Sequence, residues 1–328
     1  MRAVAIVNGR ARRVRGRLRT KLERAAPGMV RFTTSLDHAR EVIRAELRRG
    51  LDLIVLGGGD GTVVMGLTLI AEACRGLGRS EPAVGILRLG SGNAFADTVG
   101  ASSDPAADLA RLVHGEGSWR PVPLLDVLGV RAPFVGIGLD AQLLEDHHLV
   151  GAIVDRVPVA RRLGGASRYA ISVATRSIPR FATITRPNAT VRNLGAPAIE
   201  MGRGGPTGRT VATGDVLWSG AVTMVAGATI PFFGFGLKMF AFGGARADRF
   251  QLRCADGGFF ETMRAVPSAF RGDYFSEHTH DFLCDRVNIE LDVESAVEAG
   301  GELLGRRRQL DLALAKPVTL VALAKDPS

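Results

Sequence analysis

The first third of the chain alternates short apolar runs with amphipathic segments. Residues 3–7, 53–56 and 84–87 are apolar runs of strand length, and the second and third each lead into a glycine-rich turn. Strands that are buried on both faces carry such continuous apolar runs, and strands that alternate with helices form parallel sheets. The pattern therefore predicts a parallel sheet wrapped by helices, with strand, glycine turn and helix as the repeated unit.

The segment after residue 33 carries the clearest helical pattern. Its apolar positions recur every three or four residues and are Leu36, Ala39, Ile43 and Leu47. Thr34 or Ser35 can cap this helix, and Gly50 can end it. A second helical stretch is expected from about residue 62 to residue 74.

From about residue 121 the pattern changes to short alternating segments separated by glycine and proline, which are typical of an antiparallel sheet. These segments are residues 133–139, 221–226, 250–253 and 287–293. Weak periodicity over residues 185–214 predicts a long loop or an irregular excursion. We therefore expect two domains, residues 1–121 and residues 122–315, with a last strand at about 316–328 that can return to the first domain.

Charge and composition add a preference for anionic partners. The chain has 328 residues and a formal net charge of +9, and basic residues are dense between Arg10 and Lys21. A genome-wide preference for arginine codons explains the excess equally well, and the dense run is either a solvated helix face or a contact for phosphate or an anionic membrane. No stretch of about 18 apolar residues occurs. We expect a cytoplasmic protein whose membrane contact, if any, is peripheral.

The strongest chemical signal is the sequence Gly-Gly-Asp-Gly-Thr at residues 58–62, between a buried strand and a helix. Glycines let the backbone approach an anion, and the amino end of the helix adds a positive partial charge. The carboxylate of Asp60 can hold Mg²⁺ against phosphates, and the hydroxyl of Thr62 can donate to a phosphate oxygen or cap the helix. The backbone amides of this phosphate-binding loop would come from Gly58, Gly59 and Gly61.

A second polar glycine turn follows the next strand. It consists of Gly90, Ser91, Gly92 and Asn93. The carboxyl ends of neighbouring parallel strands lie at one edge of a sheet, so both turns would face the same ligand. The chain lacks the Lys-Ser/Thr ending of a Walker loop and a complete GxGxxG fingerprint, so neither common phosphate-loop family explains the glycines.

The two turns, written GGDGT and LRLGSGNAFADTVG, resemble the motifs of the diacylglycerol kinase, sphingosine kinase and ceramide kinase superfamily. The resemblance extends over most of the chain and is closest to the soluble bacterial lipid kinases. NAD kinases and phosphofructokinases share GGDGT, but the continuation GNAFA at residues 92–96 separates this chain from both. The resemblance implies an α/β protein with a Rossmann-like nucleotide-binding amino-terminal domain, a mainly antiparallel β carboxy-terminal domain for the lipid substrate, and ATP in the cleft.

The resemblance also implies which residues bind the nucleotide and metal. Those expected around ATP are Asn8, Thr33, Gly58, Gly59, Asp60, Gly61, Thr62, Gly90, Ser91 and Asn93, and Asp60 would also bind the Mg²⁺ of ATP. A second, structural Mg²⁺ would lie near Asp248, within the segment that includes Ala245 and Phe250. Arg246 stands where the family usually has glycine, so a surface salt bridge explains Asp248 as well.

The family's catalytic signature late in the chain is Asp-Gly-Glu, and its best match is Gly300-Gly301-Glu302. Glu302 would then be the general base that takes the proton from the attacking hydroxyl. The aspartate of the signature is absent. Val64 also replaces a polar residue after GGDGT, and Asp140 matches an acidic family position that either supports the site or satisfies backbone donors.

These residues lead to the hypothesis of an enzyme: an ATP-dependent lipid kinase that phosphorylates a hydroxyl of a diacylglycerol-like or sphingoid lipid, with a place in phospholipid biosynthesis. Two alternatives remain open. One is a kinase for a non-lipid hydroxyl such as NAD, and the other is a catalytically impaired nucleotide- or lipid-binding protein on the same scaffold. The expected partners are ATP, Mg²⁺ and a lipid; no nucleic acid is expected, and a homodimer is left open.

Overall fold

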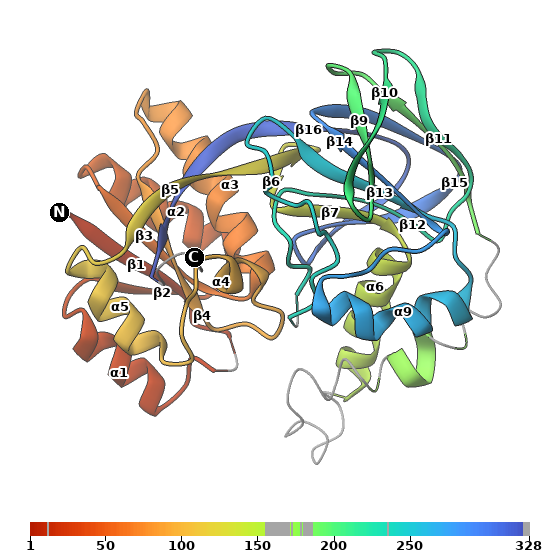
Figure 1. Ribbon diagram of the computed structural model, residues 1–328. Helices are drawn as coiled ribbons and strands as arrows, with labels where there is room; N and C mark the ends of the chain where they lie inside the picture. Colours follow the sequence, from red (N-terminus) through yellow and green to blue (C-terminus); the bar gives the residue numbers. More distant parts are fainter. Residues whose placement is uncertain are drawn as a thin grey trace.

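The computed structural model describes residues 1–11, 13–154, 171, 173–177, 179, 186–234 and 236–323. Figure 1 shows its two parts side by side: parallel strands with their helices in the amino-terminal part, and long antiparallel strands in the carboxy-terminal part. This arrangement confirms the predicted α/β fold with a mainly β carboxy-terminal part.

Four parallel strands form the sheet of the amino-terminal part, in the order β2-β1-β3-β4. Its elements are β1 (Ala3–Asn8), α1 (Arg17–Ala25), β2 (Val30–Thr33), α2 (Leu36–Arg48), β3 (Leu53–Gly58), α3 (Asp60–Leu77), β4 (Ala83–Arg88), α4 (Ala94–Thr98) and α5 (Pro105–Val113). Helix α2 is the helix predicted after residue 33, and its cap is Ser35, whose hydroxyl oxygen accepts a 3.1 Å hydrogen bond from the N–H of His38.

The carboxy-terminal part consists of antiparallel strands with α6 and α9 on one side, below the strands in Figure 1. Its elements are β5 (Ser118–Val127), β6 (Val130–Ala132), β7 (Phe134–Gly138), α6 (Leu139–Val154), the π-helix Val173–Ser177, β8 (Asn188–Asn193), β9 (Ala198–Gly202), β10 (Gly205–Val211), β11 (Val216–Ala221), β12 (Met224–Ala228), β13 (Phe250–Ala255), α9 (Phe259–Arg271), β14 (Thr279–Cys284), β15 (Arg286–Ala299) and β16 (Glu302–Ala322). None of the helices among the described residues is both long and apolar enough to span a membrane.

The expectation of a long loop or an irregular excursion over residues 185–214 is wrong for most of the residues that the structure describes there. They form β8, β9 and β10, and β9 and β10 pair as an antiparallel hairpin. Most of β10 is exposed on both faces, so its sequence lacks the alternation of apolar and polar residues by which strands are recognised. Residue 185 itself lies outside the described residues.

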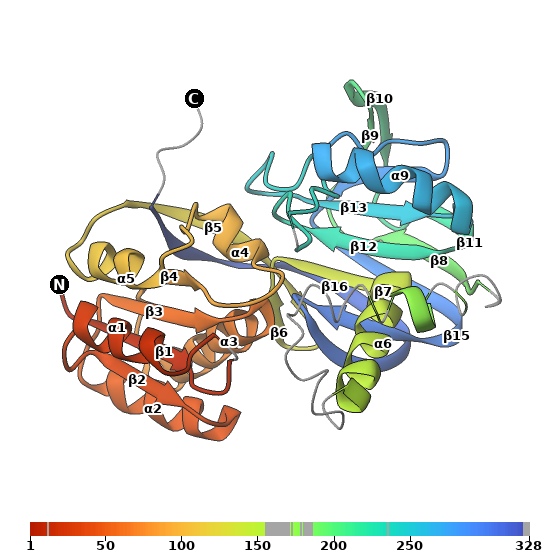
Figure 2. The same cartoon turned by 90° about the horizontal axis from the view of Figure 1, so that it is seen from below.

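The last strand, β16, links the two parts of the molecule. It begins at Glu302, pairs with β15 and β5 in antiparallel fashion, and ends beside β4, where Leu320 pairs with Val84 in parallel. Figures 1 and 2 both show this strand running from the β-rich part into the amino-terminal sheet. The strand expected near residue 316 is therefore the end of a longer one, and residues 324–328 lie outside the described residues.

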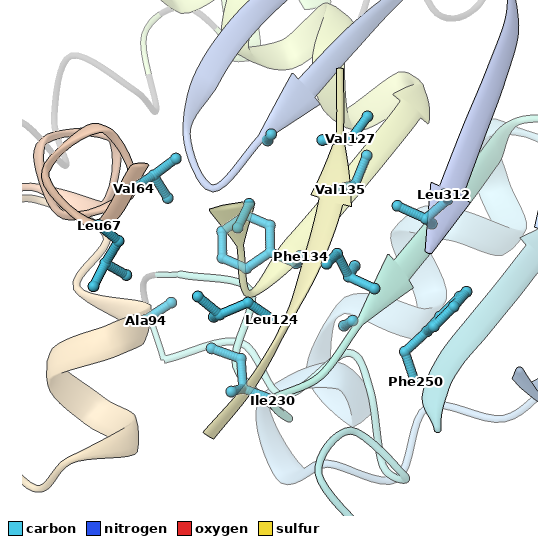
Figure 3. Close-up of a cluster of buried hydrophobic side chains, with 14 of the residues drawn as sticks. Val64, Leu67, Ala94, Leu124, Val127, Phe134, Val135, Ile230, Phe250 and Leu312 are labelled. Carbon is cyan, nitrogen blue, oxygen red and sulfur yellow. The ribbon is translucent and has the colours of Figure 1, made fainter. Parts of the chain in front are cut away.

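One hydrophobic core extends across both parts. Val64 and Leu67 of α3 belong to the same buried cluster as Leu124 of β5 and Phe134 of β7. Figure 3 shows these side chains between the helix and the strands. Packing of α3 against the β-rich part brings the start of this helix, which carries the GGDGT sequence, close to the strands of the second part. The proposed division at residues 121 and 122 falls within β5, which itself pairs with β16.

Candidate functional site

The GGDGT sequence forms a tight turn between β3 and α3, with Gly59 as the residue before the helix and Asp60 as its first residue. A Cβ atom on Gly58 would lie 2.4 Å from the Cβ atom of Thr62, so this position accepts only glycine. The side-chain amide of Asn8 donates a 3.2 Å hydrogen bond to the hydroxyl of Thr62. The Thr62 hydroxyl is therefore tied to the end of β1.

The second turn packs directly against the first. A Cβ atom on Gly90 would lie 2.4 Å from the Cα atom of Gly59, so the two backbones are in contact. Asn93 closes its own turn: its side-chain oxygen accepts from the N–H of Gly90 and its side-chain amide donates to the Gly90 carbonyl, both at 2.9 Å. The expectation that both turns lie at one edge of the parallel sheet is confirmed. The side-chain amide of Asn93 is hydrogen-bonded to the backbone of its own turn.

The Asp60 carboxylate joins the two turns. Its Oδ1 atom accepts a 3.2 Å hydrogen bond from the N–H of Phe95 at the start of α4. A Cβ atom on Gly92 would lie 2.6 Å from Oδ2. Desolvation raises the pKa of Asp60, and the backbone amides of the second turn partly offset that rise. One oxygen is thus held by protein backbone, and the other, Oδ2, lies against Gly92.

The other residues expected around a nucleotide lie at the same edge of the sheet. Asn8 and Thr33 are paired at the ends of β1 and β2. Thr33 is buried, and its hydroxyl donates to the carbonyl of Val7 at 3.4 Å. Ser91 is exposed at the second turn. The structure therefore brings these three residues near the GGDGT turn, with only the hydroxyl of Ser91 open to solvent.

Glu302 reaches the GGDGT turn from the far end of the sequence. It is the first residue of β16, and its Oε1 atom lies 1.9 Å from where a Cβ atom on Gly61 would be. Desolvation by burial raises the pKa of the Glu302 carboxyl. The glycine at position 61 is what allows this carboxylate to rest on the first turn of α3, next to Asp60.

Sequence reasoning missed a further carboxylate, Glu298. This residue of β15 is buried, and its Oε2 atom accepts a 2.9 Å hydrogen bond from the N–H of Gly301. Burial raises its pKa well above the ordinary value, and the negative charge of Asp140 adds to the rise. Burial likewise raises the pKa of Asp140 to about 7. The sequence offers only an acidic residue two positions before the glycine pair, and its contact with Gly301 appears only in the folded chain.

The turn expected to hold a structural Mg²⁺ contains an arginine instead. Both carboxylate oxygens of Asp248 accept hydrogen bonds of 2.9 Å from the guanidinium of Arg246, which lowers the pKa of Asp248. Phe250 is fully buried on β13, and Ala245 lies in the preceding turn. Because Arg246 occupies both oxygens, these residues do not fit a metal ion. Among the described residues, no cluster of three or more His, Cys, Asp and Glu side chains is arranged to hold one.

Comparison with known proteins agrees with this geometry. The family model of the diacylglycerol kinase catalytic domain matches residues 2–126. The protein named "Probable lipid kinase YegS-like" of Pseudomonas aeruginosa is 40% identical over 100 residues, which cover 30% of each chain. Its namesake in Pseudomonas putida is 39% identical over 83 residues, which cover 25% of this chain and 26% of the relative. The aligned stretch thus spans less than a third of these curated relatives.

Solved structures extend the likeness to the whole fold. A candidate diacylglycerol kinase of Bacillus anthracis superimposes with a TM-score of 0.67 at 18% identity, covering 98% of this chain and 97% of the other. A second structure from the same organism, described as a diacylglycerol kinase, has a TM-score of 0.63 at 16% identity, covering 98% and 96%. The family model thus covers residues 2–126, which carry the motifs that suggested this superfamily, and the solved structures share the fold of the whole chain.

Proposed function

We propose that this protein is an ATP-dependent lipid kinase that transfers the γ-phosphoryl group of ATP to a lipid hydroxyl. The observation that carries the proposal is the position of Glu302, whose carboxylate rests on Gly61 in the first turn of α3. A carboxylate beside a phosphate-binding turn can act as a general base, and burial raises the pKa of Glu302, which makes this carboxylate a stronger base. The names of the Pseudomonas relatives support a lipid as acceptor.

In the proposed reaction the backbone amides of residues 58–61 and the amino end of α3 hold the phosphates of ATP. Asp60 would hold the Mg²⁺ of ATP, and this ion would supply positive charge that offsets part of the charge of the phosphates. Glu302 accepts the proton of the lipid hydroxyl while the hydroxyl oxygen forms its bond to the γ-phosphorus. The bond between this phosphorus and the bridging oxygen breaks, and ADP leaves with that oxygen.

The acceptor class is tested by incubating the protein with γ-labelled ATP and Mg²⁺ in three parallel mixtures: total lipid extract, NAD and simple sugars. Label in the lipid fraction, identified by mass spectrometry as a phosphorylated diacylglycerol or sphingoid base, is the expected result. Transfer to NAD alone would overturn the lipid assignment and support the non-lipid alternative.

A specific observation also favours a second candidate, a protein that binds ATP or lipid without turnover. Gly300 stands in place of the family's aspartate, and a Cβ atom there would lie 2.4 Å from the Cγ2 atom of Val64. This candidate predicts ATP binding by calorimetry with no label transfer to any acceptor, and binding that the substitution Glu302→Gln leaves unchanged.

A further inference from the structure

The turn that carries Glu302 has no aspartate to anchor it. Gly300 and Gly301 connect β15 to β16 with φ values of +53° and +88°, a left-handed region that glycine tolerates best. A side chain on Gly300 would run into Val64 of α3. Figure 3 shows Val64 beside this connection. An aspartate at position 300 would therefore meet Val64 of the neighbouring helix.

Glu298 supplies a carboxylate to the same turn from the strand. Its Oε2 atom accepts the 2.9 Å hydrogen bond from the N–H of Gly301, the residue next to Glu302. The side chain is 3% exposed, and its other oxygen, Oε1, has no hydrogen-bond partner in the described part of the chain. A buried carboxyl group with one unsatisfied oxygen destabilises a fold, so its presence calls for a specific role.

The carboxyl group of Asp140 lies beside Glu298, at the paired position of the neighbouring strand. Gly136 of β7 is the cross-strand partner of Glu298. The Oδ2 atom of Asp140 lies only 1.3 Å from where a Cβ atom on Gly136 would be, so this carboxyl group takes the place of the missing side chain. Side chains on directly paired residues are close neighbours. Glu298 is thus confined between Asp140 on one side and the Gly300–Gly301 turn on the other.

We propose that Glu298 is a positioning residue that holds the Gly300–Gly301 turn, and through it Glu302, against Gly61 in place of the absent aspartate at position 300. This inference rests on the proposed function for its kinetic consequence. A general base is effective only within hydrogen-bond reach of its proton, and a displacement of about 1 Å can lower the rate about 100-fold. Glu298 does not contact the reacting atoms and acts through Glu302.

The test compares Glu298→Met with Glu298→Gln. The two side chains have similar volumes, but only glutamine keeps an oxygen that can accept from the Gly301 N–H. Glu290→Met, an exposed position on the same strand, is the matched control. We expect Glu298→Met to lower kcat about 100-fold with little change in KM for ATP, and Glu298→Gln to stay within about threefold of wild type.

A second readout does not depend on catalysis. Hydrogen exchange at the Gly301 amide should be markedly faster in Glu298→Met than in wild type, Glu298→Gln or Glu290→Met, with thermal unfolding recorded for all four proteins. Equal exchange in the two Glu298 variants, or equal kcat in Glu298→Met and wild type, would overturn the inference. If wild type transfers no phosphate, the proposed function fails, and the exchange data still decide whether Glu298 holds the turn.

Discussion

At the scale of single residues, the site consists of carboxylates that rest against glycines. Glu302 lies on Gly61, Asp140 fills the side-chain position of Gly136, and Asp60 lies against Gly92. In each case a methyl group on the glycine would overlap a carboxylate oxygen. Glycines of this kind are required by the neighbouring carboxylate, and in the case of Gly61 also by the turn that binds phosphate in our proposal.

Substitution of Gly61 tests this arrangement. Gly61→Ala would place a methyl group 1.9 Å from Oε1 of Glu302, and we expect a loss of about 100-fold in phosphoryl transfer because the base is displaced. The matched control is Gly76→Ala on the same helix, where a Cβ atom meets nothing within 4 Å. That control should leave transfer unchanged and raise stability by about 0.5–1 kcal/mol in thermal unfolding. Equal activity in the two variants would contradict the placement of Glu302.

The raised pKa of Glu302 predicts a pH dependence of the rate. A general base works only when ionised, so kcat should fall as the pH drops through the pKa of Glu302, which lies above the ordinary value for glutamate. The profile is measured at saturating ATP and lipid. A kcat that stays constant down to the ordinary pKa of glutamate, about 4.3, would contradict the role.

At the scale of elements, the sequence predicted the helices and strands whose apolar residues recur with a clear period. It did not predict strands whose exposed residues carry no such period. The helix after residue 33 was found because its apolar spacing and its cap agree. The hairpin of β9 and β10 was missed because most of β10 faces solvent and carries no alternation. Glu302 was found through a family motif, whereas Glu298 was missed because only tertiary pairing reveals that it points at Gly301.

The contact between α3 and the β15–β16 connection gives a prediction at this scale. Gly300→Asp should destabilise the protein by about 1–3 kcal/mol, because the new side chain strains the backbone and meets Val64. Val64→Ala also destabilises, since it leaves a cavity.

The double variant removes the overlap, so its loss should be smaller than the sum of the two single losses. Denaturant unfolding of the three variants measures this coupling. Additive losses would show that residues 64 and 300 do not interact.

At the scale of the whole molecule, one core and one long strand hold the site together. Strand β16 begins at Glu302 beside the GGDGT turn and ends in the amino-terminal sheet beside β4. The sequence predicted a parallel sheet followed by an antiparallel one and a last strand that can return to the first sheet, but not that this strand would begin at Glu302 and run for 21 residues. Pairing between residues so distant in sequence leaves no local signal.

The buried Asp140 predicts how global stability depends on pH. Its pKa is raised from 3.8 to about 7, so the folded state binds the proton more tightly than the unfolded state does. Stability from this group is present below pH 4 and is lost as the pH rises towards 7. In urea unfolding, the free energy of unfolding of Asp140→Asn should fall less steeply with rising pH than that of wild type. The decline that remains in this variant comes from Glu298. An unchanged decline in Asp140→Asn would exclude Asp140 as its source.

The central claim is that Glu302 activates a lipid hydroxyl for attack on ATP at the GGDGT turn. The most direct measurement follows the γ-label of ATP into total lipid extract with wild type and Glu302→Gln side by side, after calorimetry has shown equal ATP binding. The account predicts labelled lipid from wild type and a rate at least about 100-fold lower from Glu302→Gln. Equal labelling by the two proteins, or none by wild type, would contradict it.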